Sequence, residues 1–173
     1  MDTLDFEQLV AQYHEPLFRF AYSLAQTEVE ARELTQQTFY LWAAKGHQLR
    51  DLSKVKTWLF TTLHREYLGG KRRQVRFPHF ELEEVEVELP VQAPPGSYRL
   101  DGVTVREALA QIDELYRVPL ALFYLEDYSY NEIAEILQVP LGTIKSRISR
   151  GMAMLQELFG ADRTTAARKV ANG

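Results

Sequence analysis

The chain has 173 residues, of which 46% are hydrophobic and 25% are charged, as is typical of a folded globular protein. It has no cysteine, which excludes a disulfide framework and a thiolate metal site, and its net charge of -4 is unusual for a protein that binds DNA alone. The start, MDTLDFEQ, lacks signal-peptide features and no apolar run could span a membrane, so we expect a cytoplasmic protein without membrane insertion.

Residues 5 to about 73 contain three stretches with apolar residues at helical spacing. Each stretch follows a residue suited to an N-cap: Asp5, Thr27 and Ser53. The first stretch includes Pro16, which removes an amide donor and predicts a kink. The second is expected to end near Gly46, and the third at Gly69-Gly70, directly before a basic cluster. This pattern predicts a small helical domain.

The middle segment, residues 74–103, changes character. It contains FELEEVEVELP and four prolines, and Pro-rich charged segments seldom bury enough surface to fold alone. The alternation at Glu83-Val85-Glu86 leaves a short strand possible, but we expect a solvated acidic linker.

A second helical block extends over residues 104–159. Thr104 and Glu107 form a capping box at its first helix. The next helix, from about Val118 to Glu126, would tolerate Pro119 only in its first turn. Residues 160–173 are expected to form a weakly ordered tail.

Residues 129–150 have the layout of a DNA-reading helix-turn-helix. Ser129 and Glu132 form a capping box, and Val139, Pro140 and Gly142 are expected to break the first helix. The second helix, from about Thr143, has one apolar face and one cationic, hydroxyl-rich face suited to phosphates and base edges. An ordinary amphipathic helix with a solvated basic face remains the alternative for this stretch alone.

The chain resembles ECF (extracytoplasmic function) sigma factors of bacterial RNA polymerase. Three segments in the family's order carry the resemblance: ARELTQQTFYLW (31–42), VKTWLFTTLHREYLGGKRR (55–73) and YSYNEIAEILQVPLGTIKSRISRGMAML (128–155). The resemblance implies an all-α fold of two small domains, a region 2-like domain at 1–73 and a region 4-like domain at 104–159, joined by the linker. It also implies a transcription initiation factor that directs core RNA polymerase to promoter −10 and −35 elements and assists strand opening.

The resemblance assigns roles to residues of this sequence. The residues implied in polymerase binding are Glu33, Gln36 and Gln37. Those implied at the −10 element are His47, Gln48, Arg50 and Asp51, for capture of a flipped base, Thr57, Thr61, His64 and Arg65 on the adjacent helix face, and Lys71, Arg72 and Arg73 for backbone phosphates. Those implied at the −35 element are Thr143, Lys145, Ser146, Arg147 and Arg150.

The sequence departs from the family at three places. Glu33 and Gln37 stand where the family often has Asp and Glu, so the polymerase-binding surface is less acidic. Thr61 and Arg65 stand where many members have Arg and Asn, and Val118-Pro119 replaces polar or basic residues. These departures predict a different −10 preference and one missing backbone contact.

The resemblance implies core RNA polymerase, promoter DNA and an inhibitory anti-sigma factor as partners, and a linker that threads toward the polymerase cleft. No catalytic motif is present and the four histidines lack metal-ligand spacing, so we expect no enzyme activity, cofactor or metal. Two other classes remain open: a stand-alone helix-turn-helix regulator, which would bind DNA tightly without polymerase, and an adaptor for which Lys145 and Arg150 are dispensable.

Overall fold

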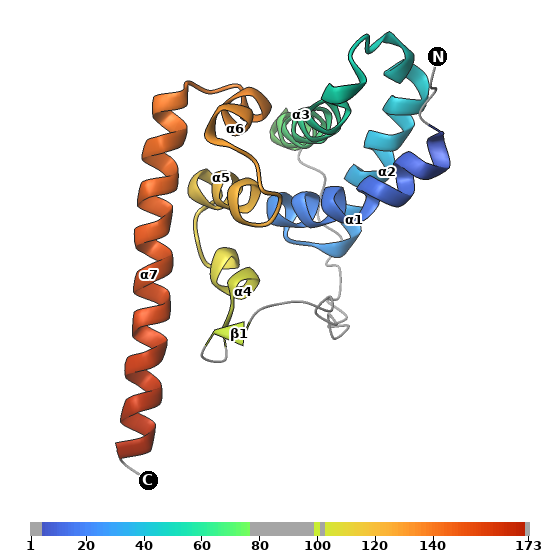
Figure 1. Cartoon of the computed structure of the whole chain (residues 1–173). Coiled ribbons are helices and arrows are strands. Elements are labelled where there is room, and N and C mark those ends of the chain that lie inside the picture. The colour runs from blue at the N-terminus through green and yellow to red at the C-terminus, as the bar shows by residue number, and fades with distance from the viewer. Residues whose placement is uncertain (1–4, 77–98, 101–102, 172–173) are drawn as a thin grey trace.

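The computed structural model describes residues 5–76, 99–100 and 103–171, and Figure 1 shows their arrangement. The seven helices of these residues are α1 (Phe6–Ala25), α2 (Glu28–Lys45), α3 (Val55–Arg76), α4 (Val105–Ala110), α5 (Glu114–Tyr124), α6 (Tyr130–Leu137) and α7 (Leu141–Ala171). Two short 3-10 turns, Gly46–Gln48 and Leu52–Lys54, separate α2 from α3. The predicted all-α class is confirmed, and most of the predicted linker, 77–98, lies outside the described residues.

The described strands are only two residues long. β1 (Arg99–Leu100) pairs antiparallel with β2 (Val103–Thr104), with Arg99 opposite Thr104. This pair leads into α4 and does not change the all-α class.

The first domain is formed by α1, α2 and α3. The side chain of Asp5 accepts a hydrogen bond from the Glu7 amide at 3.3 Å, and that of Thr27 accepts one from the Glu30 amide at 3.4 Å, so both predicted caps are present. The core residues Phe20 and Phe60 stack with ring centroids 5.3 Å apart. Apolar burial of this kind stabilises the packing of α1 on α3.

Both ends of α3 differ from the sequence prediction. Asp51, not Ser53, caps the turn before α3, because its carboxylate accepts hydrogen bonds from both the amide and the hydroxyl of Ser53. At the other end, α3 continues through Gly69 and Gly70 to Arg76. Contacts from Tyr67 and Lys71 to Glu114 of α5 hold the helix on both sides of the glycine pair, and they offset the low helix propensity of glycine.

The second domain is formed by α4 to α7. α5 begins at Glu114 and not near Val118, because Asp113 caps it by accepting a hydrogen bond from the Leu115 amide at 2.9 Å. Pro119 therefore lies inside the helix, where a proline costs about 3 kcal/mol. The residues on either side of it are 5% and 0% exposed (Val118 and Leu120), so tertiary burial holds the helix together at this position.

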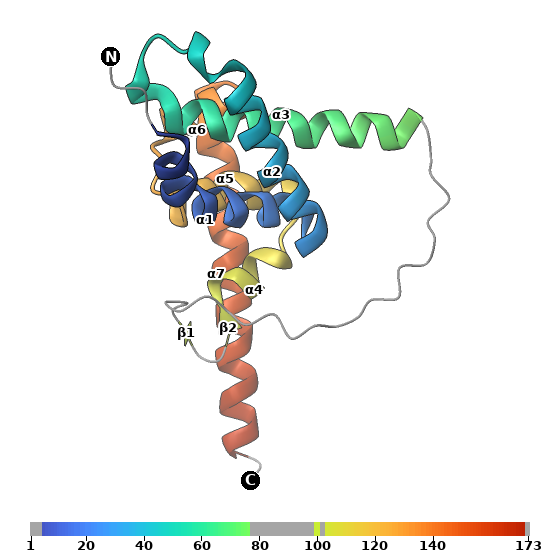
Figure 2. The ribbon, with the colours of Figure 1, turned by 90° about the vertical axis from the view of Figure 1, so that its right-hand side faces the viewer.

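Residues 160–171, the larger part of the predicted tail, are helical. They continue α7, which extends beyond the rest of the molecule in Figures 1 and 2. The sequence after Gly160, ADRTTAARKVA, contains neither glycine nor proline and is rich in alanine, the strongest helix former.

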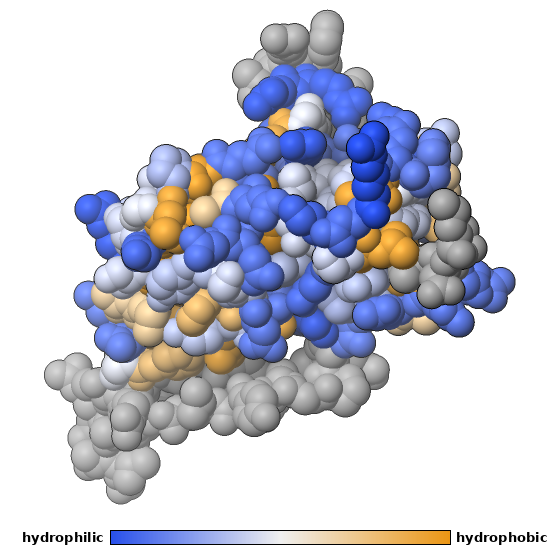
Figure 3. Space-filling model, turned by 45° about the horizontal axis from the view of Figure 1, so that its top comes forward, coloured by the Kyte–Doolittle hydropathy of each residue, from blue (hydrophilic) through white to orange (hydrophobic). Residues whose placement is uncertain are grey.

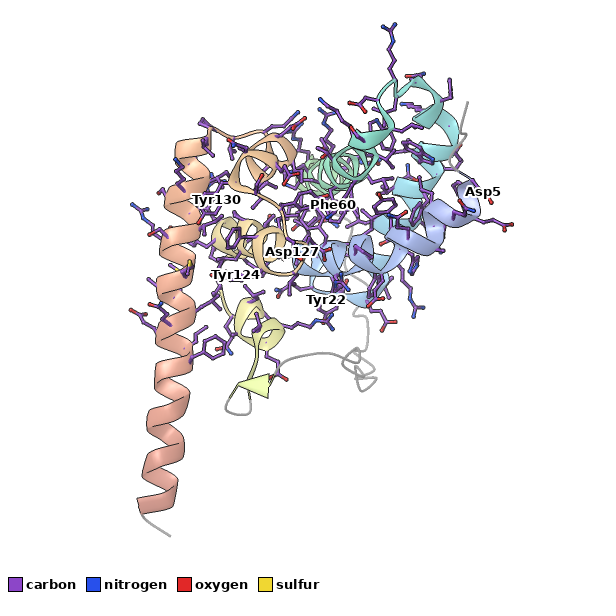
Figure 4. The ribbon with its side chains drawn as sticks, in the orientation of Figure 1. Asp5, Tyr22, Phe60, Tyr124, Asp127 and Tyr130 are labelled. Carbon is purple, nitrogen blue, oxygen red and sulfur yellow. The ribbon has the colours of Figure 1, made fainter. Side chains whose placement is uncertain are left out.

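The two domains pack directly on each other. α1 lies against α5, and α3 lies against α6 (Figure 1). Phe60, labelled in Figure 4, meets the ring of Tyr128 edge-on at 5.2 Å, and one continuous apolar core contains buried residues of both domains. The face seen in Figure 3 is mainly polar with small separate apolar patches, so the apolar surface of both domains is largely turned inward at that face.

Candidate nucleic-acid interface

The helix-turn-helix is formed by α6, a three-residue turn and the start of α7. The predicted capping box is present: the Glu132 carboxylate accepts from the Ser129 amide at 2.8 Å, and the Ser129 hydroxyl accepts from the Glu132 amide at 3.3 Å. The turn is made by Gln138, whose φ of 55° lies in the left-handed region. Gly142, which we expected in the turn, is already inside α7.

The first turns of α7 present a cationic face. Ile144 and Ile148 are buried against the domain core, which turns Lys145, Ser146 and Arg150 outward as exposed side chains. Thr143 and Arg147 are partly buried at the edges of this face. The structure therefore brings the five predicted −35 residues together on one end of α7, with three of them fully available to a ligand.

The loop between α2 and α3 carries His47, Gln48, Arg50 and Asp51, all exposed. Asp51 is engaged in capping, and its hydrogen bonds to Ser53 lower the pKa of its carboxyl group. Asp51 therefore shapes the loop, while the other three side chains are free to meet a base. Gly46 begins the loop against the indole of Trp42, which in turn meets Trp58 edge-on at 5.2 Å. Trp58 is part of this packing.

The predicted −10 face of α3 is only partly open to solvent. Arg65 is exposed, whereas Thr57, Thr61 and His64 are partly buried, and His64 lines a groove that Leu137 of α6 also lines. Burial lowers the pKa of His64 to about 4, against the opposing effect of the Glu114 carboxylate. His64 is thus an uncharged imidazole at neutral pH.

The basic cluster that follows is helical. Lys71 forms an ion pair with Glu114 of α5, and the hydrogen bonds that its ammonium donates to Glu114 and Tyr67 raise the pKa of Lys71. Arg73 donates from Nε to the Gly69 carbonyl oxygen at 3.4 Å. Lys71, Arg72 and Arg73 are all exposed.

The predicted polymerase-binding residues lie on α2. Glu33, Gln36 and Gln37 are exposed, and Glu33 and Gln37 line a hollow of about 560 Å³ between α2 and α3. Lys71 and Arg73 line the opposite wall of the same hollow. The structure therefore joins two residue sets that the sequence placed in different roles.

Sequence reasoning missed the charged residues that connect the domains: Glu114, Arg117 and Glu126. Glu126 accepts from Arg19 Nε at 3.0 Å, and its backbone oxygen accepts from Lys56 at 3.1 Å. Burial is the largest effect on the pKa of Glu126, which is raised even though Arg19 opposes it. Its neighbour Asp127, labelled in Figure 4, lies in the same loop beside α1.

Two features are absent from the described part of the chain: a group of metal-ligating side chains and an apolar helix of membrane length. Among residues 5–76, 99–100 and 103–171, no cluster of three or more histidine or carboxylate side chains could hold a metal ion. None of the helices described is long and apolar enough to cross a membrane. His79 lies outside these residues.

Comparison with known proteins identifies the class. The family model "Sigma-70 region 2" matches residues 9–77, and "Sigma-70, region 4" matches residues 103–155. The sigma factor RpoE from Bartonella quintana, solved in complex with the anti-sigma factor NepR, is 32% identical with a TM-score of 0.74, over 91% of this chain and 98% of that chain. The chain belongs to the sigma-70 family of RNA polymerase sigma factors, in the ECF group.

Two curated relatives agree with this assignment. The ECF RNA polymerase sigma factor SigE of Mycolicibacterium smegmatis is 30% identical over 155 residues, which are 87% of this chain and 60% of that protein. The RNA polymerase sigma factor YlaC of Bacillus subtilis is 25% identical over 155 residues, which are 87% of this chain and 90% of that protein. The chain thus spans 60% of the length of SigE and most of YlaC.

Proposed function

We propose that this sigma factor binds core RNA polymerase through α2 and directs it to promoters through α3 and α7. The observation that carries the proposal is the exposed face of α7, where Lys145 and Arg150 project from a properly capped helix-turn-helix. Such side chains suit a major groove, where a well-formed bidentate contact discriminates between bases by about 1–3 kcal/mol. The α2–α3 loop and the exposed Arg65 would meet the −10 element.

The acidic net charge of -4 supports dependence on a large partner. Non-specific DNA affinity comes mainly from cations that contact phosphates, and here they are few and clustered. Polymerase would supply that affinity, and the sigma factor would supply promoter choice. The role is non-catalytic and cytoplasmic, and the acidic linker would thread toward the polymerase cleft.

The test is transcription in vitro with sigma-free core polymerase on a genomic fragment library, with transcript ends sequenced. We expect discrete start sites that share −35 and −10 elements. Lys145→Ala and Arg150→Ala should each weaken use of these promoters about 5- to 150-fold, the equivalent of about 1–3 kcal/mol. Gln156→Ala is the control, because Gln156 is an exposed side chain of the same helix, α7, outside the predicted −35 residues.

Two results would contradict the proposal. Specific DNA binding by the protein alone, without core-dependent transcription, would favour a stand-alone helix-turn-helix regulator. Normal promoter use by the Lys145→Ala and Arg150→Ala variants would favour an adaptor.

We also infer an inhibitory anti-sigma partner that covers the polymerase-binding surfaces. The inference is supported by the solved complex of RpoE with the anti-sigma factor NepR. A gene for such a partner is expected beside that of this chain, and its product should abolish core-dependent transcription. Constitutive activity in the native cell, with no such gene, would contradict the inference.

A further inference from the structure

A groove between the two domains contains residues predicted to contact both promoter elements. It has a volume of about 500 Å³ and lies between α3, α5 and the helix-turn-helix. His64 and Lys71 line it from the −10 helix, and Arg147 lines it from the −35 helix. Asp113 and Glu114 are its acidic residues. DNA that lay along this side of α3 would have to enter the space that α5 occupies.

Within this groove, Glu114 holds the cation that DNA would use. Its Oε2 atom accepts hydrogen bonds from the Lys71 ammonium and, at 3.0 Å, from the Tyr67 hydroxyl. The Lys71 ammonium also lies 4.9 Å from the centre of the Tyr67 ring. A carboxylate oxygen that accepts from a lysine and a hydroxyl makes the same kinds of contact as a phosphate oxygen of nucleic acid.

The remaining contacts between the domains keep Glu114 in this position. Arg117 donates from Nε to the Ser23 carbonyl oxygen at 2.7 Å, and Arg19 pairs with the Glu126 carboxylate, whose side chain is only 4% exposed. Phe60 of the first domain also packs on Tyr128 of the second. Breaking one buried charged hydrogen bond leaves its partner unsatisfied and is costly. The contacts between the two domains are therefore expected to break together.

We propose that the second domain competes with promoter DNA for binding to α3. The Glu114 carboxylate pairs with Lys71 in the position that a DNA phosphate would take. The closed arrangement then lowers the affinity of the free chain for DNA, and the domains must part before α3 can bind DNA along its whole length. This inference rests on the proposed role of Lys71 in phosphate binding.

The test compares two variants with the same change of charge in the same domain. Glu114→Gln removes the carboxylate that faces Lys71, whereas Glu135→Gln removes an exposed carboxylate of α6. Binding to a fluorescein-labelled duplex of arbitrary sequence is followed by anisotropy from 20 to 200 mM salt, about the range over which phosphate contacts dominate affinity. We expect Glu114→Gln to bind several-fold more tightly than Glu135→Gln, with a salt slope steeper by about 0.9, the value for one phosphate contact.

A double-mutant cycle shows whether the gain in DNA affinity of Glu114→Gln depends on Lys71. Lys71→Gln should erase the advantage of Glu114→Gln and weaken the wild type much less, because Lys71 is already occupied there. Equal affinities and slopes for Glu114→Gln and Glu135→Gln would overturn the proposal. The proposal would also be overturned if Glu114→Gln gave the same gain in DNA affinity in a protein that carries Lys71→Gln. Core-dependent transcription by the wild type tests the proposed function separately, because it does not depend on competition within the free chain. If transcription is normal and the DNA-binding tests fail, only the competition proposal is overturned.

A distance measurement tests the closed state itself. The chain has no cysteine, so Gln12→Cys on α1 and Gln156→Cys on α7, both exposed, can be spin-labelled specifically. Double electron–electron resonance should give one narrow distance between the two spin labels in the free protein. It should give a longer and broader distance distribution when duplex DNA is bound. A distribution that DNA leaves unchanged would overturn the proposal, because the closed form would then bind DNA directly.

Discussion

Arg117 of α5 and Ser23 of α1 are joined across the two domains by a hydrogen bond from Nε to the Ser23 carbonyl oxygen, 2.7 Å long. A second guanidinium nitrogen of Arg117 donates to the Ile112 carbonyl oxygen at 2.7 Å. Ser23 lies in the last turn of α1 and Ile112 follows the end of α4, where carbonyl groups lack helical partners and carry partial negative charge. A buried cation is thereby accommodated by the ends of two helices.

Arg117→Met should destabilise the protein by about 2–4 kcal/mol, because it leaves two buried carbonyl groups without a donor, and each such loss costs about 1–3 kcal/mol. Urea denaturation followed by circular dichroism measures the change. Arg32→Met, at an exposed i,i+4 pair, should cost less than about 0.5 kcal/mol. Equal losses for the two variants would mean that the carbonyl groups are satisfied by water without Arg117.

Tyr128→Phe should leave stability unchanged or raise it by up to about 1 kcal/mol. Its hydroxyl is buried with no hydrogen-bond partner in the described part of the chain, so it has been desolvated without compensation. Tyr67→Phe is the contrasting variant, because that hydroxyl donates to the Leu24 carbonyl oxygen at 3.1 Å and to Glu114 at 3.0 Å. It should lose about 1–2 kcal/mol in the same denaturation experiment. A clear loss from Tyr128→Phe would reveal a partner for that hydroxyl.

Gly46→Ala should lower stability by about 1–3 kcal/mol and impair the loop before α3. A Cβ atom at Gly46 would lie 2.6 Å from the rigid indole of Trp42, so the ring or the loop must move. Gly142→Ala is the control, since nothing lies within 4 Å of that position inside α7 and alanine favours the helix by up to about 1 kcal/mol. Thermal melts should therefore shift in opposite directions.

The buried imidazole of His64 predicts a loss of stability in mild acid. Its pKa is lowered to about 4, so the unfolded chain binds a proton below about pH 6.5 while the folded chain does not. The free energy of unfolding should then fall as the pH drops from 6.5 to 4, by about 1–2 kcal/mol at pH 5. The charged groups that line the same groove are Lys71, Asp113, Glu114 and Arg147.

Urea denaturation at pH 7 and pH 5 tests this expectation, because it gives the change in the free energy of unfolding between the two pH values for each protein. His64→Gln should lose less stability between the two pH values than the wild type, because glutamine does not titrate. His47→Gln, at an exposed histidine, should follow the wild type. Identical pH dependence for all three proteins would show that His64 remains solvated.

Local capping chemistry predicted the beginnings of α1, α2 and α6, but not those of α3 and α5. The capping box of Ser129 and Glu132 and the cap at Asp5 involve residues two or three positions apart, so the sequence contains both partners. The continuation of α3 past Gly69 depends on contacts with Glu114 of the other domain, which no local pattern reveals. The position of Pro119 inside α5 follows from the local cap at Asp113, which the sequence analysis did not identify.

The same division applies to the candidate site. The cationic face of α7 follows from helical spacing alone, and Lys145 and Arg150 are exposed as that spacing requires. The pairing of Lys71 with Glu114 joins residues 43 positions apart and could not be foreseen. One signal was present: Arg117 interrupts an otherwise apolar stretch of α5, and a charge in that position is usually buried with partners.

The helical form of α3 beyond its glycine pair changes how its basic cluster meets DNA. Successive residues of an α-helix point about 100° apart, so Lys71, Arg72 and Arg73 are spread over about 200° of the helix circumference. A single DNA strand follows one side of a helix and can reach no more than two of them together. Under the proposed function, two of these three adjacent charges would therefore face one DNA strand together, and the third would point toward the other side of α3.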